Sequence, residues 1–221
     1  ALGFGIVVLY IFSGGFLAVA WSDFFQGSLM FVGLLLLPIV AFFSISGNES
    51  IISGLNEIDP GLLNPWGAGG LTLMNLMSVL GLLSIGIGFM GSPQVYVRFI
   101  AIRDESEVEK GKWVAVIYTL LTDTAAVCIG LLGRYMLTRS GDNPELILGT
   151  AGEDVLALVL GQVMPTIIIG IYIAAVLSAV MSTVDSLLVV ASSAVTRDFY
   201  QKILNPQVDE SKLMALSLIH I

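Results

Sequence analysis

Long runs of apolar residues alternate with short polar connections along this chain. The apolar segments cover residues 1–20, 24–46, 70–102, 113–137 and 155–194. Each is long enough to cross a bilayer, which needs about 20 apolar residues. Because lipid cannot hydrogen-bond a backbone, the segments are predicted to be helices. We therefore expect an all-α polytopic membrane protein, with about five transmembrane helices in one domain fragment, residues 1–221, of a longer protein.

The composition supports a membrane protein and argues against several other classes. Hydrophobic residues make up 56% of the chain and charged residues 12%, whereas a soluble domain carries about twice that charge density. The net charge of −8 argues against nucleic-acid binding, which needs basic patches. The sequence shows no zinc motif or nucleophile–base pair. We therefore expect no enzyme and no cofactor.

The basic residues predict how the chain is oriented in the cell membrane. Seven of them flank the connections 103–112 and 197–212, namely Arg98, Arg103, Lys110, Lys112, Arg197, Lys202 and Lys212. On the other side stand Arg134 and Arg139. Since basic loops stay in the cytoplasm, residues 103–112 and 197–212 are predicted to be cytoplasmic. Residues 47–69 and 138–154 are then external, and a short break at residues 21–23 is cytoplasmic.

The third apolar segment is too long and too rich in helix breakers for one straight span. Its 33 residues would extend about 50 Å as a helix, against a bilayer core of about 30 Å. Gly86, Gly88, Gly91 and Pro93 lie in its middle, where glycine and proline weaken a helix. A local unwinding is predicted here. It indicates either a transporter's binding site or a simple kink.

The last apolar segment carries polar residues on one helix face. Ala179, Ser182 and Thr183 have the spacing i, i+3, i+4, and Ser182, Asp185 and Ser186 repeat it. Hydroxyls, carbonyls and a carboxylate are the oxygen ligands that a small hard cation prefers. A carboxylate deep in a span costs at least about 2.5 kcal/mol, so Asp185 indicates an ion path, a proton relay or a buried pair. Helix–helix packing is the alternative role of the hydroxyls.

Three stretches of the chain together resemble one transporter family. YIFSGGFLAVAWSDFFQGSLM resembles the junction of the fourth and fifth core helices of the sodium:solute symporter family. The family's sixth core helix is similar to GIGFMGSPQVYVRFIAI, and its eighth to AAVLSAVMSTVDSLLVVASSAVTRDFY. Within the family, the chain most resembles the bacterial sodium/proline symporters. The resemblance implies a five-plus-five inverted-repeat fold of the leucine-transporter type, of which the chain supplies core helices four to eight. It also implies sodium-coupled uptake of a small organic solute by alternating access.

The resemblance implies two cation sites. The primary sodium site would use the carbonyl of Ala179 and the hydroxyls of Ser182 and Thr183. A second sodium ion, which some family members bind, would use Asp23, Ser182, Asp185 and Ser186. From the residues alone, Asp23 could equally cap a helix start.

The resemblance also places the solute site on the broken helix, at Ile85, Phe89 and Pro93. Proline symporters carry Trp and Tyr where this chain has Ile85 and Phe89, so the pocket is expected to be more apolar. The solute would be an amino acid such as proline, or an organic acid. Two alternatives stay open: a proton-coupled carrier that uses Asp185, and a membrane sensor that retains the transporter fold.

Overall fold

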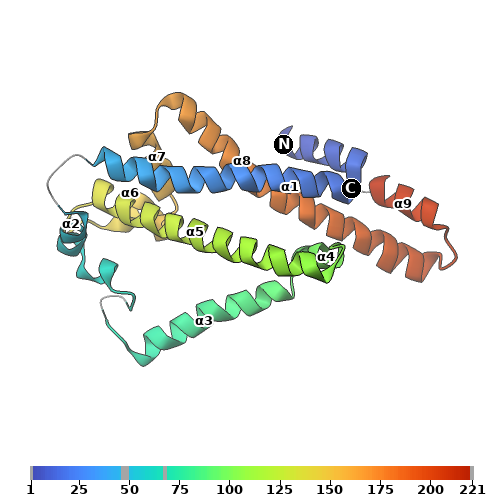
Figure 1. Cartoon of the computed structure of the whole chain (residues 1–221), viewed down its shortest axis with the longest axis horizontal. Coiled ribbons are helices and arrows are strands. Elements are labelled where there is room, and N and C mark those ends of the chain that lie inside the picture. Colours follow the sequence, from blue (N-terminus) through green and yellow to red (C-terminus); the bar gives the residue numbers. More distant parts are fainter. Residues whose placement is uncertain (1, 46–49, 67–68, 220–221) are drawn as a thin grey trace. The chain divides into compact units, whose positions relative to one another are not determined.

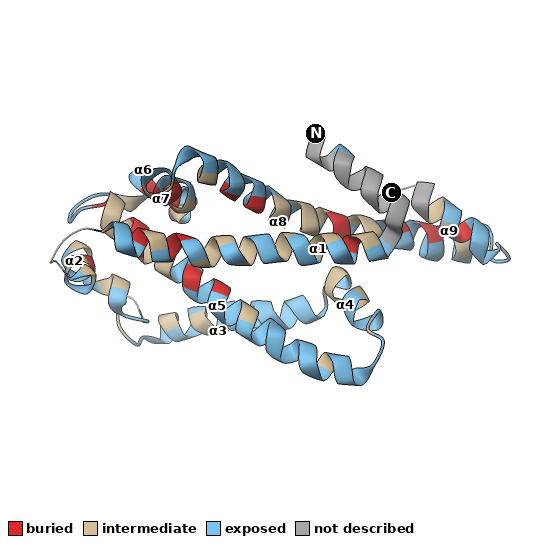
Figure 2. Ribbon diagram, turned by 45° about the horizontal axis from the view of Figure 1, so that its top comes forward, coloured by how far each residue is buried: buried red, intermediate tan, exposed pale blue. Residues whose placement is uncertain are grey.

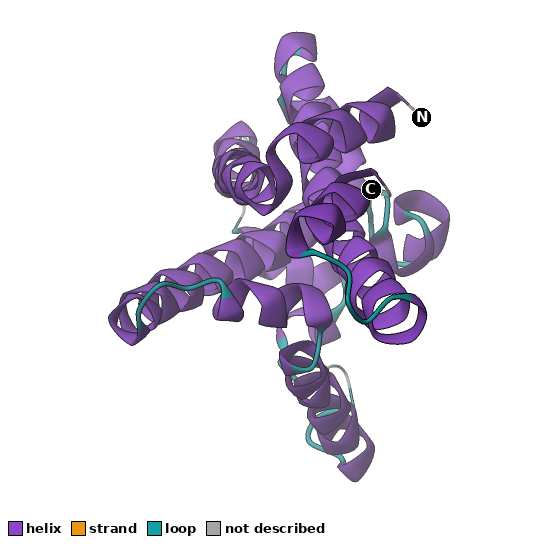
Figure 3. Cartoon of the chain, turned by 90° about the vertical axis from the view of Figure 1, so that its right-hand side faces the viewer, coloured by secondary structure: helices purple, strands orange, loops and turns teal. Residues whose placement is uncertain are grey.

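The computed structural model describes residues 2–45, 50–66 and 69–219, and in these ranges every regular element is a helix (Figures 1 and 3). The long helices are α1 (Leu2–Ser44), α3 (Leu73–Met90), α5 (Glu105–Leu137) and α8 (Thr166–Ser193). A π-helical segment, Ala194–Leu204, continues α8. The shorter helices are α2 (Ile51–Ile58), α4 (Pro93–Ile100), α6 (Pro144–Leu148), α7 (Val155–Val163) and α9 (Glu210–Ile219), with 3-10 turns at Pro60–Leu63 and Thr150–Gly152.

Within the described residues, four helical stretches are long and apolar enough to cross a membrane. They are Phe16–Ser44, Leu73–Met90, Glu105–Leu137 and Thr166–Leu204. The first predicted segment, residues 1–20, lies largely outside the residues whose side chains are described. Within the loop predicted over residues 47–69, residues 47–49 and 67–68 lie outside the described part of the chain. The connections between the four stretches alternate sides if each crosses the bilayer once.

The polar break predicted at residues 21–23 is not seen, since α1 continues through it from Leu2 to Ser44. Neither Ser22 nor Asp23 is a strong helix breaker, and residues 21–23 contain no glycine or proline. Both side chains hydrogen-bond residues far along the chain. A polar side chain that finds a distant partner does not need to cap a new helix.

The break predicted in the third segment is present, at a narrower place than expected. α3 ends at Met90, and α4 begins at Pro93 after the extended residue Ser92, whose φ and ψ are −70° and 122°. Proline disfavours the helical conformation in the residue before it and is well tolerated at the first position of a helix. Gly86 and Gly88 remain helical. Proline, rather than the number of glycines, decides where the helix ends.

The apolar segment 155–194, predicted as one helix, forms two helices in the structure. α7 ends at Val163, Met164 is extended with φ −112° and ψ 143°, and α8 begins at Thr166. Pro165 explains the division by the same restriction on the preceding residue. The fourth segment also differs, because α5 starts at Glu105 rather than at residue 113. Its first turns carry charged residues, so the helix extends beyond its apolar part.

The chain divides into two compact units. Unit 1 contains Ala1–Met30, Met90–Asp104 and Ile173–Ile221, and unit 2 contains Phe31–Phe89 and Glu105–Tyr172. In unit 2, a core forms where α1, α5, α6, α7 and the start of α8 pack together. Its buried residues are Leu37, Ala41, Ile129, Leu132, Leu148, Val155, Val159, Leu160 and Tyr172. α3, in the same unit, has no buried residue, as its colouring in Figure 2 shows.

A smaller apolar cluster holds unit 1 together. Val19 of α1 is 2% exposed and packs against Met181, Val184, Leu188 and Val189 of α8. The residues of α8 follow one another at the spacing of one helix face. This contact places the polar residues that neighbour Val19 on α1 next to those of α8.

Candidate functional site

Three oxygen atoms gather in the middle of α8, at residues that the sequence had indicated. The Ser182 hydroxyl donates to the Ala179 carbonyl at 3.0 Å, and the Thr183 hydroxyl donates to the same carbonyl at 3.3 Å. Ser182 is half-buried and Thr183 is exposed. The structure therefore brings together the three predicted ligands of the primary sodium site.

This arrangement fits a small hard cation. One backbone carbonyl and two hydroxyls, all on one turn, supply neutral oxygen ligands at a single place. In an α-helix the Ala179 carbonyl is already bonded by an amide, and the hydroxyl bonds back to it are weak alternatives to an ion. Each hydroxyl also keeps oxygen lone pairs that its donated bond does not use and that can face a cation.

A second polar cluster joins α1, α4 and α8 inside unit 1. Arg98 of α4 donates through Nη2 to Asp23 Oδ2 of α1 and, at 2.5 Å, to Ser186 Oγ of α8. The Ser186 hydroxyl in turn donates to the Ser182 carbonyl at 2.9 Å. The guanidinium thus links two residues of the predicted second sodium site.

Asp185 lies beside this cluster and is fully buried, with 0% exposure. Ser22 of α1 donates to its Oδ2 at 3.5 Å, a long hydrogen bond. Removing an ionised carboxylate from water is costly unless charge or hydrogen bonds offset it. Asp185 precedes Ser186 in the chain, and its partner Ser22 precedes Asp23, so a second carboxylate lies close to the residues that Arg98 bonds.

The sequence reasoning used Arg98 only to orient the chain and gave it no role in a site. One signal could have found it. Arg98 stands five residues after Pro93, within the otherwise apolar run VYVRFIAI. A lone basic residue in such a run needs a partner, although the run itself does not specify which residue that is.

The three predicted solute residues do not all belong to one compact unit. Ile85 and Phe89 stand one turn apart on α3 and are 55% and 60% exposed. Both belong to unit 2, whereas Pro93 is the first residue of α4 in unit 1. The break between α3 and α4 thus separates the three residues. Ile85 and Phe89 share one face of α3, a helix that has no buried residue.

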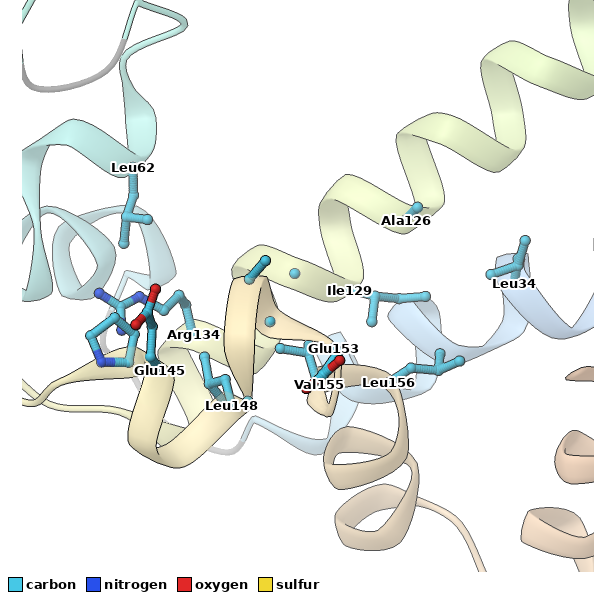
Figure 4. A pocket seen from close by; sticks show the side chains of 15 residues that line it. Leu34, Leu62, Ala126, Ile129, Arg134, Glu145, Leu148, Glu153, Val155 and Leu156 are labelled. Atoms are coloured by element: carbon cyan, nitrogen blue, oxygen red, sulfur yellow. The ribbon is translucent and has the colours of Figure 1, made fainter.

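Unit 2 also contains a pocket of about 570 Å³ that includes none of the predicted site residues. Figure 4 shows Arg134 and Glu145 at one end of it and Leu34 and Ile129 toward the other. Arg134 Nη1 is buried without a hydrogen-bond partner among the described residues. The pocket thus has a charged end, at the last turn of α5, and an apolar end.

Comparison with known proteins identifies the family. The model of the Sodium:solute symporter family matches residues 1–221. The chain is 33% identical, over 98% of its length, to the high-affinity proline transporter PutP of Bacillus subtilis, of which it covers 44%. It is 30% identical to the osmoregulated proline transporter OpuE of the same organism, over 98% of the chain and 42% of OpuE.

A third relative has a different solute in its name. The sodium/pantothenate symporter of Haemophilus influenzae is 33% identical over 88% of the chain and 38% of that relative. No solved structure matches the chain. The chain thus spans less than half the length of these relatives.

The family match agrees with the four apolar helical stretches of the described residues. The family consists of multi-pass transporters of the plasma membrane and not of enzymes. A match over the whole chain and the relatives at about one-third identity lead to the same conclusion: this chain belongs to the sodium:solute symporter family.

Proposed function

We propose that the protein is a sodium-coupled symporter that takes up a small organic solute by alternating access, in a five-plus-five inverted-repeat fold. The solute would be an amino acid such as proline, or an organic acid. The observation that carries the proposal is the set of three oxygens on α8. Ser182 and Thr183 both bond the carbonyl of Ala179, so one helical turn offers a carbonyl and two hydroxyls to a single ion.

The broken helix supports a transporter rather than a static membrane anchor. Two irregular residues, Gly91 and Ser92, separate α3 from α4. Irregular backbone at membrane depth is tolerated where it is buried in protein or lines a water-filled cavity. Broken helices are typical of transporter binding sites, because the free ends of half-helices interact with solutes and ions.

The solute class rests on the residues beside this break. Ile85 and Phe89 offer apolar surface and no hydrogen-bonding side chain, and Pro93 begins α4. We propose that these three residues contact the solute, and that Ile85 and Phe89 contact an apolar side chain or ring of it. The names of the relatives include both proline and pantothenate, which sets the range of solutes to test first.

Uptake measurements on the complete transporter test the proposal. Purified protein in proteoliposomes is supplied with a panel of labelled amino and organic acids under an inward sodium gradient, and then with potassium in place of sodium. Accumulation of a solute with sodium alone is the expected result. Accumulation that is equal in the two conditions would rule out sodium coupling.

A proton-coupled carrier is the second candidate, and the complete burial of Asp185 favours it. A buried carboxylate can carry a proton across a membrane as part of a relay. In that case uptake would follow an imposed pH gradient in sodium-free buffer. Asp185→Asn would abolish this uptake, whereas Ser182→Ala and Thr183→Ala would leave it intact.

A further inference from the structure

Arg98 holds a positive charge at the place where the resemblance puts a second sodium ion. Its Nη2 atom donates to Asp23 Oδ2 and, at 2.5 Å, to Ser186 Oγ. The three residues come from α4, α1 and α8, which meet inside unit 1. A carboxylate oxygen and a hydroxyl oxygen that could face a sodium ion thus face a guanidinium.

This ion pair differs from the other ion pairs of the described residues. In the pairs Lys112–Glu109, Arg197–Glu210 and Lys202–Asp198, every side chain is at least 50% exposed. Asp23 is 18% exposed and Arg98 is 45% exposed. Exposed pairs are strongly screened and contribute little, whereas a shielded carboxylate needs a compensating charge. Asp23 therefore has a stronger requirement for a cation than any of those acidic residues.

The charges around the cluster show why one arginine can replace an ion. Asp23 and the buried Asp185 bring two carboxylates to this region, and Arg98 is the basic side chain bonded there. Asp23 Oδ1 is buried and has no hydrogen-bond partner among the described residues. Oδ1 of this carboxylate therefore depends on the charge of the neighbouring guanidinium to offset its burial.

Open space borders the Asp23–Arg98 pair. A cavity of about 300 Å³ lies against Asp23, Arg98, Ala101 and Ile102. Arg98 also stands on a helix of eight residues that follows the Gly91–Ser92 break. A change at the break would move Arg98 together with Pro93, because both belong to the same short helix.

We propose that Arg98 is a tethered cation that takes the place of a second sodium ion at Asp23 and Ser186. The transporter then binds one sodium ion, at Ala179, Ser182 and Thr183, and loss of the guanidinium opens a second sodium position. This inference rests on the proposed sodium-coupled function and deepens it, because it fixes how many ions the protein binds.

Counting bound ions on the complete transporter tests the inference. Radioactive sodium is titrated onto the purified protein in detergent, without solute, and the number of ions bound per protein is measured at saturation. The wild type is expected to bind one ion and Arg98→Gln two. Arg103→Gln is the matched control, since Arg103 is an exposed arginine beside α4, and it should bind one. Arg98→Lys should also bind one, because it keeps the charge.

The second position should need the carboxylate that Arg98 releases. Arg98→Gln combined with Asp23→Asn is therefore expected to bind one ion again. If Arg98→Gln does not fold, as judged by size-exclusion chromatography, the wild type and Asp23→Asn decide the question. Both should bind one ion if Arg98 fills the site.

Three outcomes overturn the inference. Two ions bound to the wild type, or one ion bound to folded Arg98→Gln, would show that Arg98 does not exclude sodium. A loss of one ion in Asp23→Asn alone would make Asp23 a sodium ligand in the native protein. Absence of sodium binding in every variant would instead remove the proposed function itself, and the inference with it.

Discussion

Hydroxyl side chains on α8 bond the backbone of the preceding turn, and this is how serine and threonine are accommodated in an apolar helix. Ser182, Thr183 and Ser186 all donate to carbonyls three or four residues earlier. Such bonds keep the hydroxyls satisfied when no ion is bound. They also hold the three oxygens of the proposed sodium site, those of Ala179, Ser182 and Thr183, near one another.

Removal of these hydroxyls gives a residue-scale prediction. Ser182→Ala and Thr183→Ala should each raise the sodium concentration that half-saturates uptake by about 10-fold to 100-fold, because each removes an oxygen bonded to a charged group, worth about 1.5–3 kcal/mol. Solute uptake against sodium concentration measures the change. Ser193→Ala is the control, since Ser193 is exposed near the end of α8. Equal sodium dependence in all three variants would contradict the site.

A buried tyrosine gives a second prediction at the same scale. Tyr172 is 5% exposed, and its hydroxyl donates to the Gly33 carbonyl, so α8 and α1 are linked within unit 2. Tyr172→Phe should lower the unfolding free energy by about 1 kcal/mol, because one hydrogen bond is lost while the ring remains. Thermal unfolding of the purified transporter measures it. Tyr96→Phe, at a position 61% exposed, should leave the melting temperature unchanged.

The sequence predicts which residues lie together when they share one helix turn. It does not predict contacts between residues that are far apart along the chain. Ala179, Ser182 and Thr183 share one turn, so their proximity follows from helix geometry. Arg98 and Asp23 are 75 positions apart, and no local pattern specifies that they meet. The pairing depends on how α1 and α4 pack, which periodicity does not encode.

At the scale of elements, α5 and α7 pack closely because a glycine removes a side chain from their contact. A Cβ atom added at Gly133 would lie 2.6 Å from Val155 Cγ1 and 3.1 Å from Val159 Cγ2. Both valines belong to the core of unit 2. Small residues at helix contacts are a general means of close packing in membranes.

Gly133→Ala should therefore destabilise the protein although alanine is the better helix former. Overpacking of this kind costs about 1–3 kcal/mol, which exceeds the gain of up to about 1 kcal/mol in helix propensity. Gly130→Ala is the matched variant one turn earlier on α5, where an added Cβ meets nothing within 4 Å. Thermal unfolding should show a lower midpoint for Gly133→Ala and an equal or higher one for Gly130→Ala. The reverse order would contradict the α5–α7 contact.

Element boundaries were predictable where proline acts and less so where polarity alone suggested a break. The break before Pro93 follows from its restriction of Ser92. Pro165 obeys the same rule, but it lies at the apolar sequence VMPT, and hydropathy alone passed over it. Trp21, Ser22 and Asp23 were expected to interrupt a helix because they are polar or interfacial, yet none of them prevents helical backbone.

At the scale of the whole molecule, hydropathy predicts membrane-crossing helices, and basic residues predict their orientation. The four apolar helical stretches of the described residues agree with the first. The second is still a prediction: residues 103–112 and 197–212 face the cytoplasm, and residues 138–154 face outside.

Cysteine labelling measures the orientation. In a cysteine-free background of the complete transporter that includes Cys128→Ala, Glu145→Cys should react with a membrane-impermeant maleimide in intact cells, since its loop is predicted to be external. Glu107→Cys should react after the membrane is permeabilised and not before. Both positions are exposed, so access to the reagent depends on the side of the membrane. Labelling of Glu107→Cys in intact cells would reverse the orientation.

If Arg98 takes the place of a second sodium ion, as proposed above, its pairing with Asp23 also limits the concentration ratio that the complete transporter can maintain. One sodium ion supplies about 2.3 kcal/mol at 100 mV and about 1.4 kcal/mol for a tenfold sodium gradient. Together these sustain an accumulation of about 500-fold for a solute without net charge. A second ion would raise the ceiling to roughly the square of that ratio. On that proposal, one arginine fixes how dilute a solute source the cell can use and how much sodium it must pump out afterwards.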